Sequence, residues 1–397
     1  MTCLTQNNAR ERINTLIERV ARLGEYHMIR LASIVETFEA EFLQQYGATL
    51  PASQRYALTA LTHCRSAMSP KMQVECGDCA QQIYVPHSCG HRSCPHCQAH
   101  ESQRWIDRQL QKQVPGDYFM ITFTVPAELR PLARAQPQLI YALIMQSAWD
   151  TLHSFSRNDK KLQGTPGAAG VFHTHSRRLD FHPHVHLVMP AAAINKKSRQ
   201  WRVKQAKYLF NHKALAKVFR GKILAGIQQA GLGLPEHCPE KWVVDVKNVG
   251  NGEKALVYLG RYLYRGVIQE KDILSCDNGQ VTFRYQDSKT RKIEHRSLSG
   301  VAFLRLILQH VLPKGFRRAR NFGFLHPNSK RLIQRVQLLL KLPPRPMAAS
   351  PNKRPTLRCL CCGGEMKIVR TRIKSLFAYT LSPNNLKMEG AGREMPM

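Results

Sequence analysis

Apolar residues recur along the chain with two different spacings, and each spacing predicts a different kind of element. Spacings of three and four residues, as in Ile13, Leu16, Ile17 and Val20, are typical of one face of a helix. They predict helices at 9–46, about 133–154, 194–228, about 253–265, 298–312 and 328–341. β-rich runs such as YFMITFTVP predict strands at 118–126, 181–189, 242–249 and 280–287. Because strands and helices alternate in the middle of the chain, we expect an α/β or α+β domain there.

Changes in pattern and composition divide the chain into four parts. A helical N-terminal segment is expected over 1–55, and a cysteine-rich unit over 56–110. The mixed strand and helix pattern fills 115–345. After the Pro-rich stretch PPRPMAAS, residues 346–397 read as a basic tail with a partial CxxC knuckle.

The charge of the chain indicates the kind of partner it binds. Of its 397 residues, 59 are Lys or Arg and 27 are Asp or Glu, which gives a net charge of +32. Such an excess favours a polyanion, and nucleic acid is the usual one. The pattern shows no apolar run long enough for a membrane span and no signal peptide, so we expect a cytoplasmic, nucleoid-associated protein. Its oligomeric state stays open.

Eight of the 12 cysteines fall into two clusters, five between Cys76 and Cys97 and three between Cys359 and Cys362. In the cytoplasm we expect these cysteines to be reduced thiols or metal ligands rather than disulfides. Two CxxC knuckles predict one structural Zn²⁺ site with four thiolates. Its ligands would be Cys76, Cys79, Cys94 and Cys97. Spare donors lie nearby at His87, Cys89, His91 and His96, and unrelated thiols are the alternative. The later pair, Cys359 and Cys362, is half a site that needs a partner from elsewhere in the chain.

The stretch FHPHVHLVMP places three histidines at alternate positions of a predicted strand. His184 and His186 then project from one face, roughly 6.5–7 Å apart along the strand, and can bind one metal ion. His182 shares that face and is the first candidate for a third ligand, with Glu253 a weaker one. The alternative is a half-exposed strand whose outward residues are histidines.

The predicted helix EKALVYLGRYLYR carries Tyr258 and Tyr262 four residues apart, with Arg261 and Arg265 on the same side. Tyrosines with this spacing also pack in ordinary cores. A phenol has a pKa near 10, and a metal ion with guanidinium groups would favour the phenolate and neutralise a phosphate. Together the strand and the helix therefore fit Mg²⁺- or Mn²⁺-dependent attack of tyrosine on a phosphodiester, giving a 5′-phosphotyrosine.

These motifs, in this order, resemble a known family. HPHVHLVMP resembles the His-hydrophobic-His (HUH) motif of single-strand DNA nucleases, and YLGRY resembles the paired-tyrosine motif of rolling-circle transposases from bacterial insertion sequences. CGDC…SCGHRSCPHCQ resembles the zinc-binding domain found ahead of that catalytic domain. VTFRYQD and HVLPKGFRRARNFGFL resemble further family segments, so the similarity covers roughly 50–345.

The resemblance implies an α+β fold: a ferredoxin-like antiparallel sheet with helices (the HUH nuclease domain), preceded by a helical segment and a small zinc-binding domain. It implies His184 and His186 as metal ligands, Tyr258 and Tyr262 as nucleophiles, and the single-stranded ends of the protein's own element as substrate. A plasmid replication initiator or relaxase and a non-catalytic zinc-dependent DNA-binding regulator are the alternatives.

Basic residues are the candidates for contacts with the DNA backbone. The segment 196–222 holds ten Lys or Arg residues and no acid. Arg261 and Arg265 of the tyrosine helix are further candidates. A last group follows the predicted helix 298–312 and consists of Lys314, Arg317, Arg318 and Arg320. Solvated helix faces are the alternative for any single run of charge.

Overall fold

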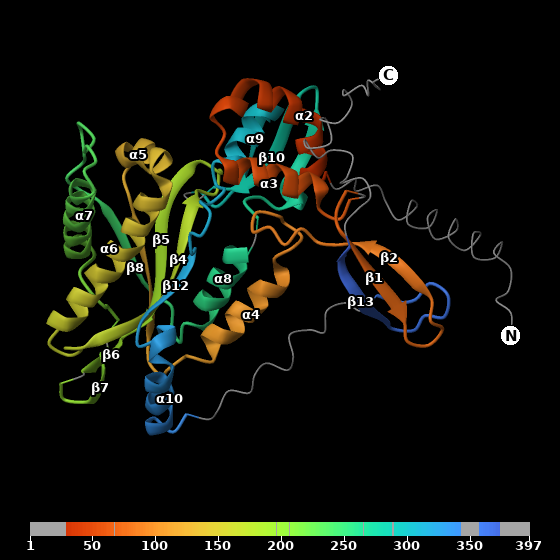
Figure 1. Ribbon diagram of the computed structural model, residues 1–397. Helices are drawn as coiled ribbons and strands as arrows, with labels where there is room; N and C mark the ends of the chain where they lie inside the picture. Colours follow the sequence, from red (N-terminus) through yellow and green to blue (C-terminus); the bar gives the residue numbers. More distant parts are fainter. Residues whose placement is uncertain are drawn as a thin grey trace, which may run out of the picture.

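The computed structural model describes residues 29–66, 68–195, 197–205, 207–264, 266–287, 290–342 and 357–373. Within them the protein is a mixed α+β molecule whose sheets are all antiparallel, as the family resemblance implied (Figure 1). The described residues contain no helix that is both long and apolar enough to cross a membrane. The part of the predicted helix 9–46 that precedes residue 29 lies outside the described residues.

The largest sheet has seven strands in the order β7-β6-β4-β5-β3-β8, with β12 paired to β4. Val171 of β4 pairs with His186 of β5 on one side and with Ala319 of β12 on the other. The strands of this sheet are β3 (Tyr118–Thr124), β4 (Thr165–His175), β5 (Phe181–Pro190), β6 (Ala192–Asn195), β7 (Gln200–Val203), β8 (Val243–Asn248) and β12 (Ala319–Gly323). β12 is therefore an edge strand, with no strand on its outer side among the described residues.

Helices cover both faces of this sheet (Figure 1). On one face, α5 (Arg130–Ala135), α6 (Pro137–Asn158) and α7 (His212–Gln229) pack on alternate strand residues such as Phe123 and Val185. On the other face, α4 (Ala99–Leu110) and α8 (Glu253–Tyr264) pack on Val171 and Val188. Alternation along β5 therefore sends Val185 and Leu187 to the first face, and His184 and His186 to the second.

A second core joins the N-terminal helices to residues 268–308, which follow the tyrosine helix, α8. The three-stranded sheet β11-β10-β9 and helix α9 pack against the N-terminal helices α2 and α3 around Phe38, Phe283 and Phe303. The elements involved are α2 (Leu31–Tyr46), α3 (Ala52–His63), β9 (Ile273–Asp277), β10 (Gln280–Gln286), β11 (Ile293–Ser299) and α9 (Gly300–Leu308). The N-terminal helices thus share their core with residues that follow α8 in sequence.

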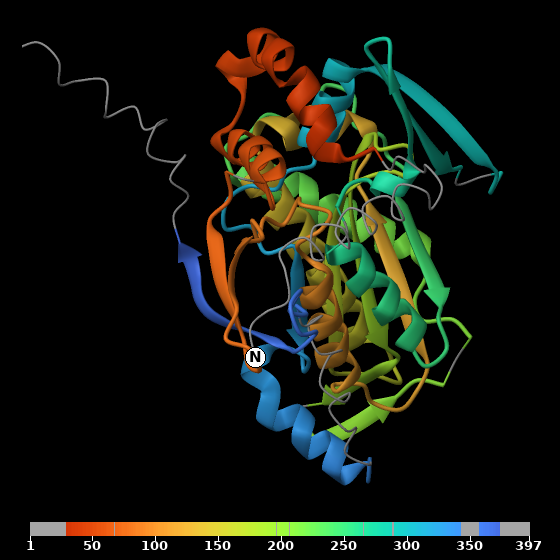
Figure 2. The same cartoon turned by 90° about the vertical axis from the view of Figure 1, so that its right-hand side faces the viewer.

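A third, small sheet lies apart from these cores (Figure 2). Its order is β13-β1-β2, formed by β1 (Lys71–Cys76), β2 (Gln82–Pro86) and β13 (Met366–Ile373). Val74 of β1 pairs with Ile368 of β13, so the far end of the described chain returns to the cysteine-rich unit. The remaining elements are α10 (Lys330–Leu339) and the short 3-10 helices η1 (Gly47–Thr49), η2 (Ala127–Leu129), η3 (Glu270–Asp272) and η4 (Pro327–Ser329).

The prediction of helix over 194–228 is wrong in its first half. Ile194 lies in β6, a mostly buried strand that pairs with β4 and ends at Asn195, and α7 begins only at His212. The side chain of Asn211 accepts a hydrogen bond from the amide of Ala214 and so caps the helix start. The predicted strands at 118–126, 181–189, 242–249 and 280–287 are confirmed, while β4 was not predicted.

Candidate active site and metal centres

Three histidines of neighbouring strands converge on the face of the main sheet that α8 covers. His173 of β4 pairs directly with His184 of β5, and His186 follows two residues later. Their rings lie 4.4 to 5.0 Å apart between centroids, and one nitrogen of each falls within 4.8 Å of the others. Three imidazole nitrogens at this separation can bind a single metal ion.

Hydrogen bonds and burial prepare these imidazoles as metal ligands. Nδ1 of His184 donates to the carbonyl of His182 at 2.6 Å, and Nδ1 of His186 bonds the Thr122 hydroxyl at 2.8 Å, which orients both rings. Burial lowers the pKa of His173 and His184 well below the ordinary value and that of His186 to about 4. The rings are therefore neutral near pH 7, the state in which histidine binds metal.

The structure does not place the other two candidates for a third ligand in this group. The ring of His182 accepts a hydrogen bond at 3.1 Å from Arg130, and it is not among the three convergent histidines. Glu253 is exposed in the first turn of α8 and lines a separate hollow. His173 takes the place that the sequence analysis gave to His182, because it comes from the neighbouring strand at the same level.

Tyr262 lies against this histidine group. Its ring stacks on His173 at 3.5 Å between centroids, and its hydroxyl is 2.8 Å from Nε2 of His175. The guanidinium of Arg318 lies 5.1 Å from the Tyr262 ring, held there because it donates to the carbonyls of Phe172 and Leu263, each at 3.0 Å. A phenol, a histidine and a fixed positive charge thus meet beside the candidate metal site.

Tyr258 has a different environment. It lies one helical turn earlier, half-exposed, with its ring 6.4 Å from that of Tyr262. Together with Lys254 and Arg261 it lines an open hollow of about 510 Å³. The structure therefore brings only one of the two predicted nucleophiles into contact with the histidine group.

The glycine of YLGRY allows a close helix contact that positions α8. A Cβ atom on Gly260 would lie 2.3 Å from Cγ1 of Ile106 and 2.9 Å from the Trp105 ring, both of α4. The Ser102 hydroxyl donates to the Gly260 carbonyl at 2.9 Å. Because α4 begins two residues after Cys97, the tyrosine helix is packed directly on the chain that leaves the cysteine cluster.

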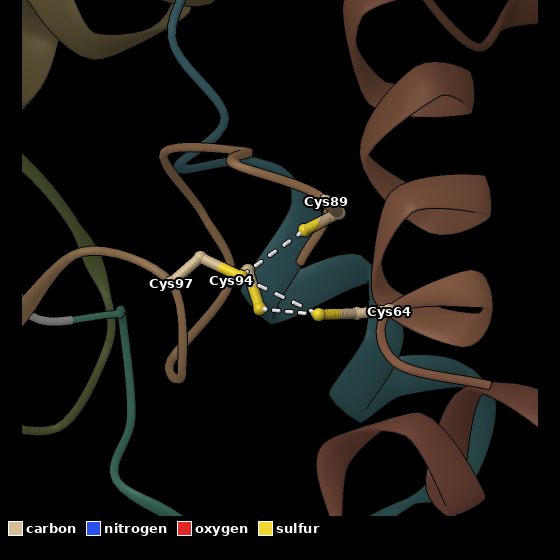
Figure 3. A group of neighbouring side chains, drawn as sticks. All are labelled: Cys64, Cys89, Cys94 and Cys97. Atoms are coloured by element: carbon tan, nitrogen blue, oxygen red, sulfur yellow. Dashed lines mark hydrogen bonds between the residues drawn. The ribbon is translucent and has the colours of Figure 1, made fainter. Parts of the chain in front are cut away.

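The cysteines form two clusters rather than the single predicted site, and the predicted grouping is wrong. Cys94 and Cys97 meet Cys64, at the end of α3, and Cys89 (Figure 3). Cys76 and Cys79 meet the distant pair Cys359 and Cys362. The strand pairing of β1 with β13 causes this grouping, because it brings the two CxxC knuckles side by side. Cys76 and Cys79 are therefore the second pair of ligands that the half site of Cys359 and Cys362 needed.

Both clusters have dimensions that suit zinc. The measured Sγ separations are 3.4 to 3.6 Å in the first cluster and in the second. Four sulfurs at about 2.3 Å from a tetrahedral zinc ion would be about 3.8 Å apart. Backbone amides of Cys362 and Cys361 also lower the pKa of the Cys359 thiol to about 7, which favours the thiolate that binds metal. These eight cysteines can hold two structural ions.

The basic candidates are not equivalent in the structure. Arg261, Lys314 and Arg317 are exposed, whereas Arg318 points to Tyr262 and Arg320 is partly buried over the Phe316 ring. Arg265 lies outside the described residues. His173, His175 and Cys64 were not among the predicted members of these sites, and Cys89 was predicted only as a spare donor. The first two had a signal, since HTH at 173–175 repeats the alternation of HVH at 184–186.

Comparison with known protein families gives two matches. Residues 167–332 match the family described as "Putative transposase", a stretch that includes the histidine group, α8 and β12. Residues 34–125 match the family described as "Transposase zinc-binding domain", which includes the first cysteine cluster and α4.

Individual proteins are similar over most of the chain. The transposase for insertion sequence element IS801 of Pseudomonas savastanoi pv. phaseolicola is 26% identical over 367 residues, which cover 84% of this chain and 85% of that protein. "Putative transposase y4qJ" of Sinorhizobium fredii is 27% identical over 318 residues, 72% of this chain and 79% of that protein. Among solved structures, the conjugative relaxase TrwC in complex with mutant oriT DNA has 18% identity and a TM-score of 0.26, over 32% of this chain and 49% of that one.

Proposed function

The chain belongs to the family of insertion-sequence rolling-circle transposases with an N-terminal zinc-binding domain, and from this premise we propose that it nicks and joins single-stranded DNA through a 5′-phosphotyrosine. The observation that carries the proposal is the contact of Tyr262 with both the three-histidine group and His175. The domain that performs the chemistry would be the ferredoxin-like HUH domain of 115–345, behind a zinc-binding domain of 56–110.

The residues around Tyr262 have complementary roles in this proposal. His175 accepts the phenol proton at its Nε2 atom, while the fixed charge of Arg318 favours the phenolate. The phenolate oxygen attacks the phosphorus, the bond from phosphorus to the 3′ oxygen breaks, and that oxygen leaves and takes up a proton to become a 3′-hydroxyl. When Mg²⁺ or Mn²⁺ is bound by His173, His184 and His186, it would polarise the phosphodiester.

The different environments of the two tyrosines support an order of action. Tyr262 already touches the histidine group and the guanidinium of Arg318, so it makes the first attack. Tyr258 is half-exposed beside Lys254 and Arg261, two cations that suit a phosphate of a second strand. Tyr258 then takes part in the second transfer. Because the phosphotyrosine keeps the energy of the broken phosphodiester, the strand can be rejoined without ATP.

The two cysteine clusters are proposed to hold Zn²⁺ with structural roles. Each cluster supplies four thiolates, so a bound ion has no open position for a substrate. The first ion would fix the chain at the point where α4 starts, and α4 in turn supports the tyrosine helix at Gly260. This arrangement makes the zinc-binding domain part of the support of the active site.

The test is incubation of the protein with labelled single-stranded DNA from the ends of its own element and Mg²⁺, followed by a denaturing gel. We expect a protein-linked 5′ product that is lost in Tyr262→Phe and kept in Tyr258→Phe when only the first cleavage is assayed. Binding without a covalent adduct, across both strands and both metals, would refute the proposed chemistry and favour a DNA-binding regulator.

A further inference from the structure

A second basic site lies outside the catalytic face, over the outer edge of strand β12. A cavity of about 740 Å³ opens there, lined by residues of α4 and α6 and by residues 317 and 319–323. Because α4 and α6 cover opposite faces of the sheet, this cavity wraps around the edge of the sheet. We call it the β12 groove.

The β12 groove concentrates positive charge without compensation. Arg108 comes from α4 and Lys112 from the turn after it, Arg317 and Arg320 come from the β12 segment, and no Asp or Glu is among the lining residues. Nε of Arg320 is buried without a hydrogen-bond partner in the described structure. Burial also lowers the pKa of Lys112, with Arg108 contributing to the shift. Four cations that face one cavity repel one another, so an anion in the groove would relieve an unfavourable arrangement.

The shape of the groove favours an extended anion over a small one. Its cations are distributed over two elements, and its volume is of the size that accepts a nucleotide rather than a single phosphate ion. The amides of Gln109 and Asn321 lie among the cations and offer donors and acceptors of the kind that contact DNA bases. The rings of Trp105 and Trp149 form a buried apolar part of the wall.

We propose that the β12 groove binds the backbone of a single-stranded DNA segment that extends beyond the segment held at Tyr262. The groove and the tyrosine site are adjacent, because two consecutive residues contribute to them. Arg317 lines the groove, and Arg318 faces Tyr262. A strand attached at the tyrosine would pass around the edge of the sheet and continue along β12. The choice of DNA as the ligand rests on the proposed function, but binding here requires no catalysis.

The test compares two variants that lose the same charge at exposed positions. Arg108→Gln with Arg317→Gln changes the groove, and Lys160→Gln with Lys161→Gln changes the exposed turn after α6. Both are made in a Tyr258→Phe, Tyr262→Phe background, and DNA affinity is measured without divalent metal. The assay therefore gives an answer even if the cleavage chemistry fails.

For a long oligonucleotide, two lost phosphate contacts should make the plot of log affinity against log salt concentration less steep by about 1.4. The affinity at 0.1 M salt should then fall by about 25-fold. The control variant should stay close to the parent. An oligonucleotide that covers only the cleavage position should lose much less affinity in the groove variant. Equal weakening in both variants, or no weakening in the groove variant, overturns the proposal. Tight binding of an extended acidic peptide, with no binding of DNA, would mean that a peptide strand pairs with the edge of β12. That result would also overturn the proposal.

Discussion

The grouping of the cysteines makes a sharp prediction about metal content. Changing Cys359 and Cys362 to serine removes two of the four sulfurs around the second cluster and leaves the first cluster intact. We expect the zinc content to fall from two ions per chain to one. A single ion held by Cys76, Cys79, Cys94 and Cys97 would instead give one zinc in both proteins.

The magnitude follows from the geometry of the second cluster. Its Sγ atoms lie 3.4 Å (Cys76 to Cys362) and 3.6 Å (Cys79 to Cys359) apart, close to the tetrahedral separation of about 3.8 Å. Structural zinc contributes about 10–16 kcal/mol of apparent binding free energy in small peptides. Two remaining thiolates make only half of the bonds, so the ion should be lost on dialysis against a mild chelator.

The assay is elemental analysis of zinc per chain after dialysis, together with counting of reactive thiols. Cys361→Ser is the matched control, because this exposed cysteine lies between the two ligands but outside the cluster. Cys64→Ser with Cys89→Ser should remove the other ion and also leave one. Two ions retained in the Cys359, Cys362 variant, or one ion in the unchanged protein, would refute the grouping.

Three other perturbations test the supports of the active site. Gly260→Ala should destabilise the protein by about 1–3 kcal/mol because the added methyl group meets Ile106. Gly221→Ala on α7 is the control and should be neutral or stabilising, because a Cβ atom there meets nothing within 4 Å. Chemical denaturation measures the stability of both variants. Because burial lowers the pKa of His310 to about 4, the unfolded chain binds the proton first as pH falls below about 6.5. This group should therefore cost roughly 2 kcal/mol of stability between pH 7 and pH 5, and His310→Gln should show a correspondingly shallower loss. His173→Ala should abolish metal-dependent cleavage while zinc content stays unchanged, and cleavage retained in that variant would exclude His173 as a ligand.

Strands that carry their own pattern could be predicted from the sequence. The alternating and β-branched runs of β3 and β5 were found, whereas β4 was missed because its first half, Gly167 to Gly170, has little intrinsic preference for a strand. Those small residues have a tertiary cause: a Cβ atom on Gly167 would lie 2.7 Å from the Phe324 ring. The pattern of a single strand does not contain this information.

The same rule holds for the candidate site: its residues on strands and helices with a clear pattern were predicted, and those on β4 were missed. His184, His186 and Tyr262 lie on elements with clear periodicity, so the sequence indicated that they share a site. His173 and His175 belong to the strand that was missed, so the third histidine and the partner of the Tyr262 hydroxyl were missed with it. The grouping of the cysteines depends on the pairing of β1 with β13, which spacing along the chain does not determine.

The second cysteine cluster has a consequence for the order in which the protein is made. Cys76 and Cys362 are 286 residues apart, and a ribosome that adds about 5–20 residues per second needs roughly 15 to 60 s to synthesise that interval. During this time the Cys76 and Cys79 thiols emerge without their partners, while α4, the main sheet and α8 can already fold. A messenger RNA interrupted before codon 359 would therefore yield a chain that has all three histidines and both tyrosines but lacks the last cross-link.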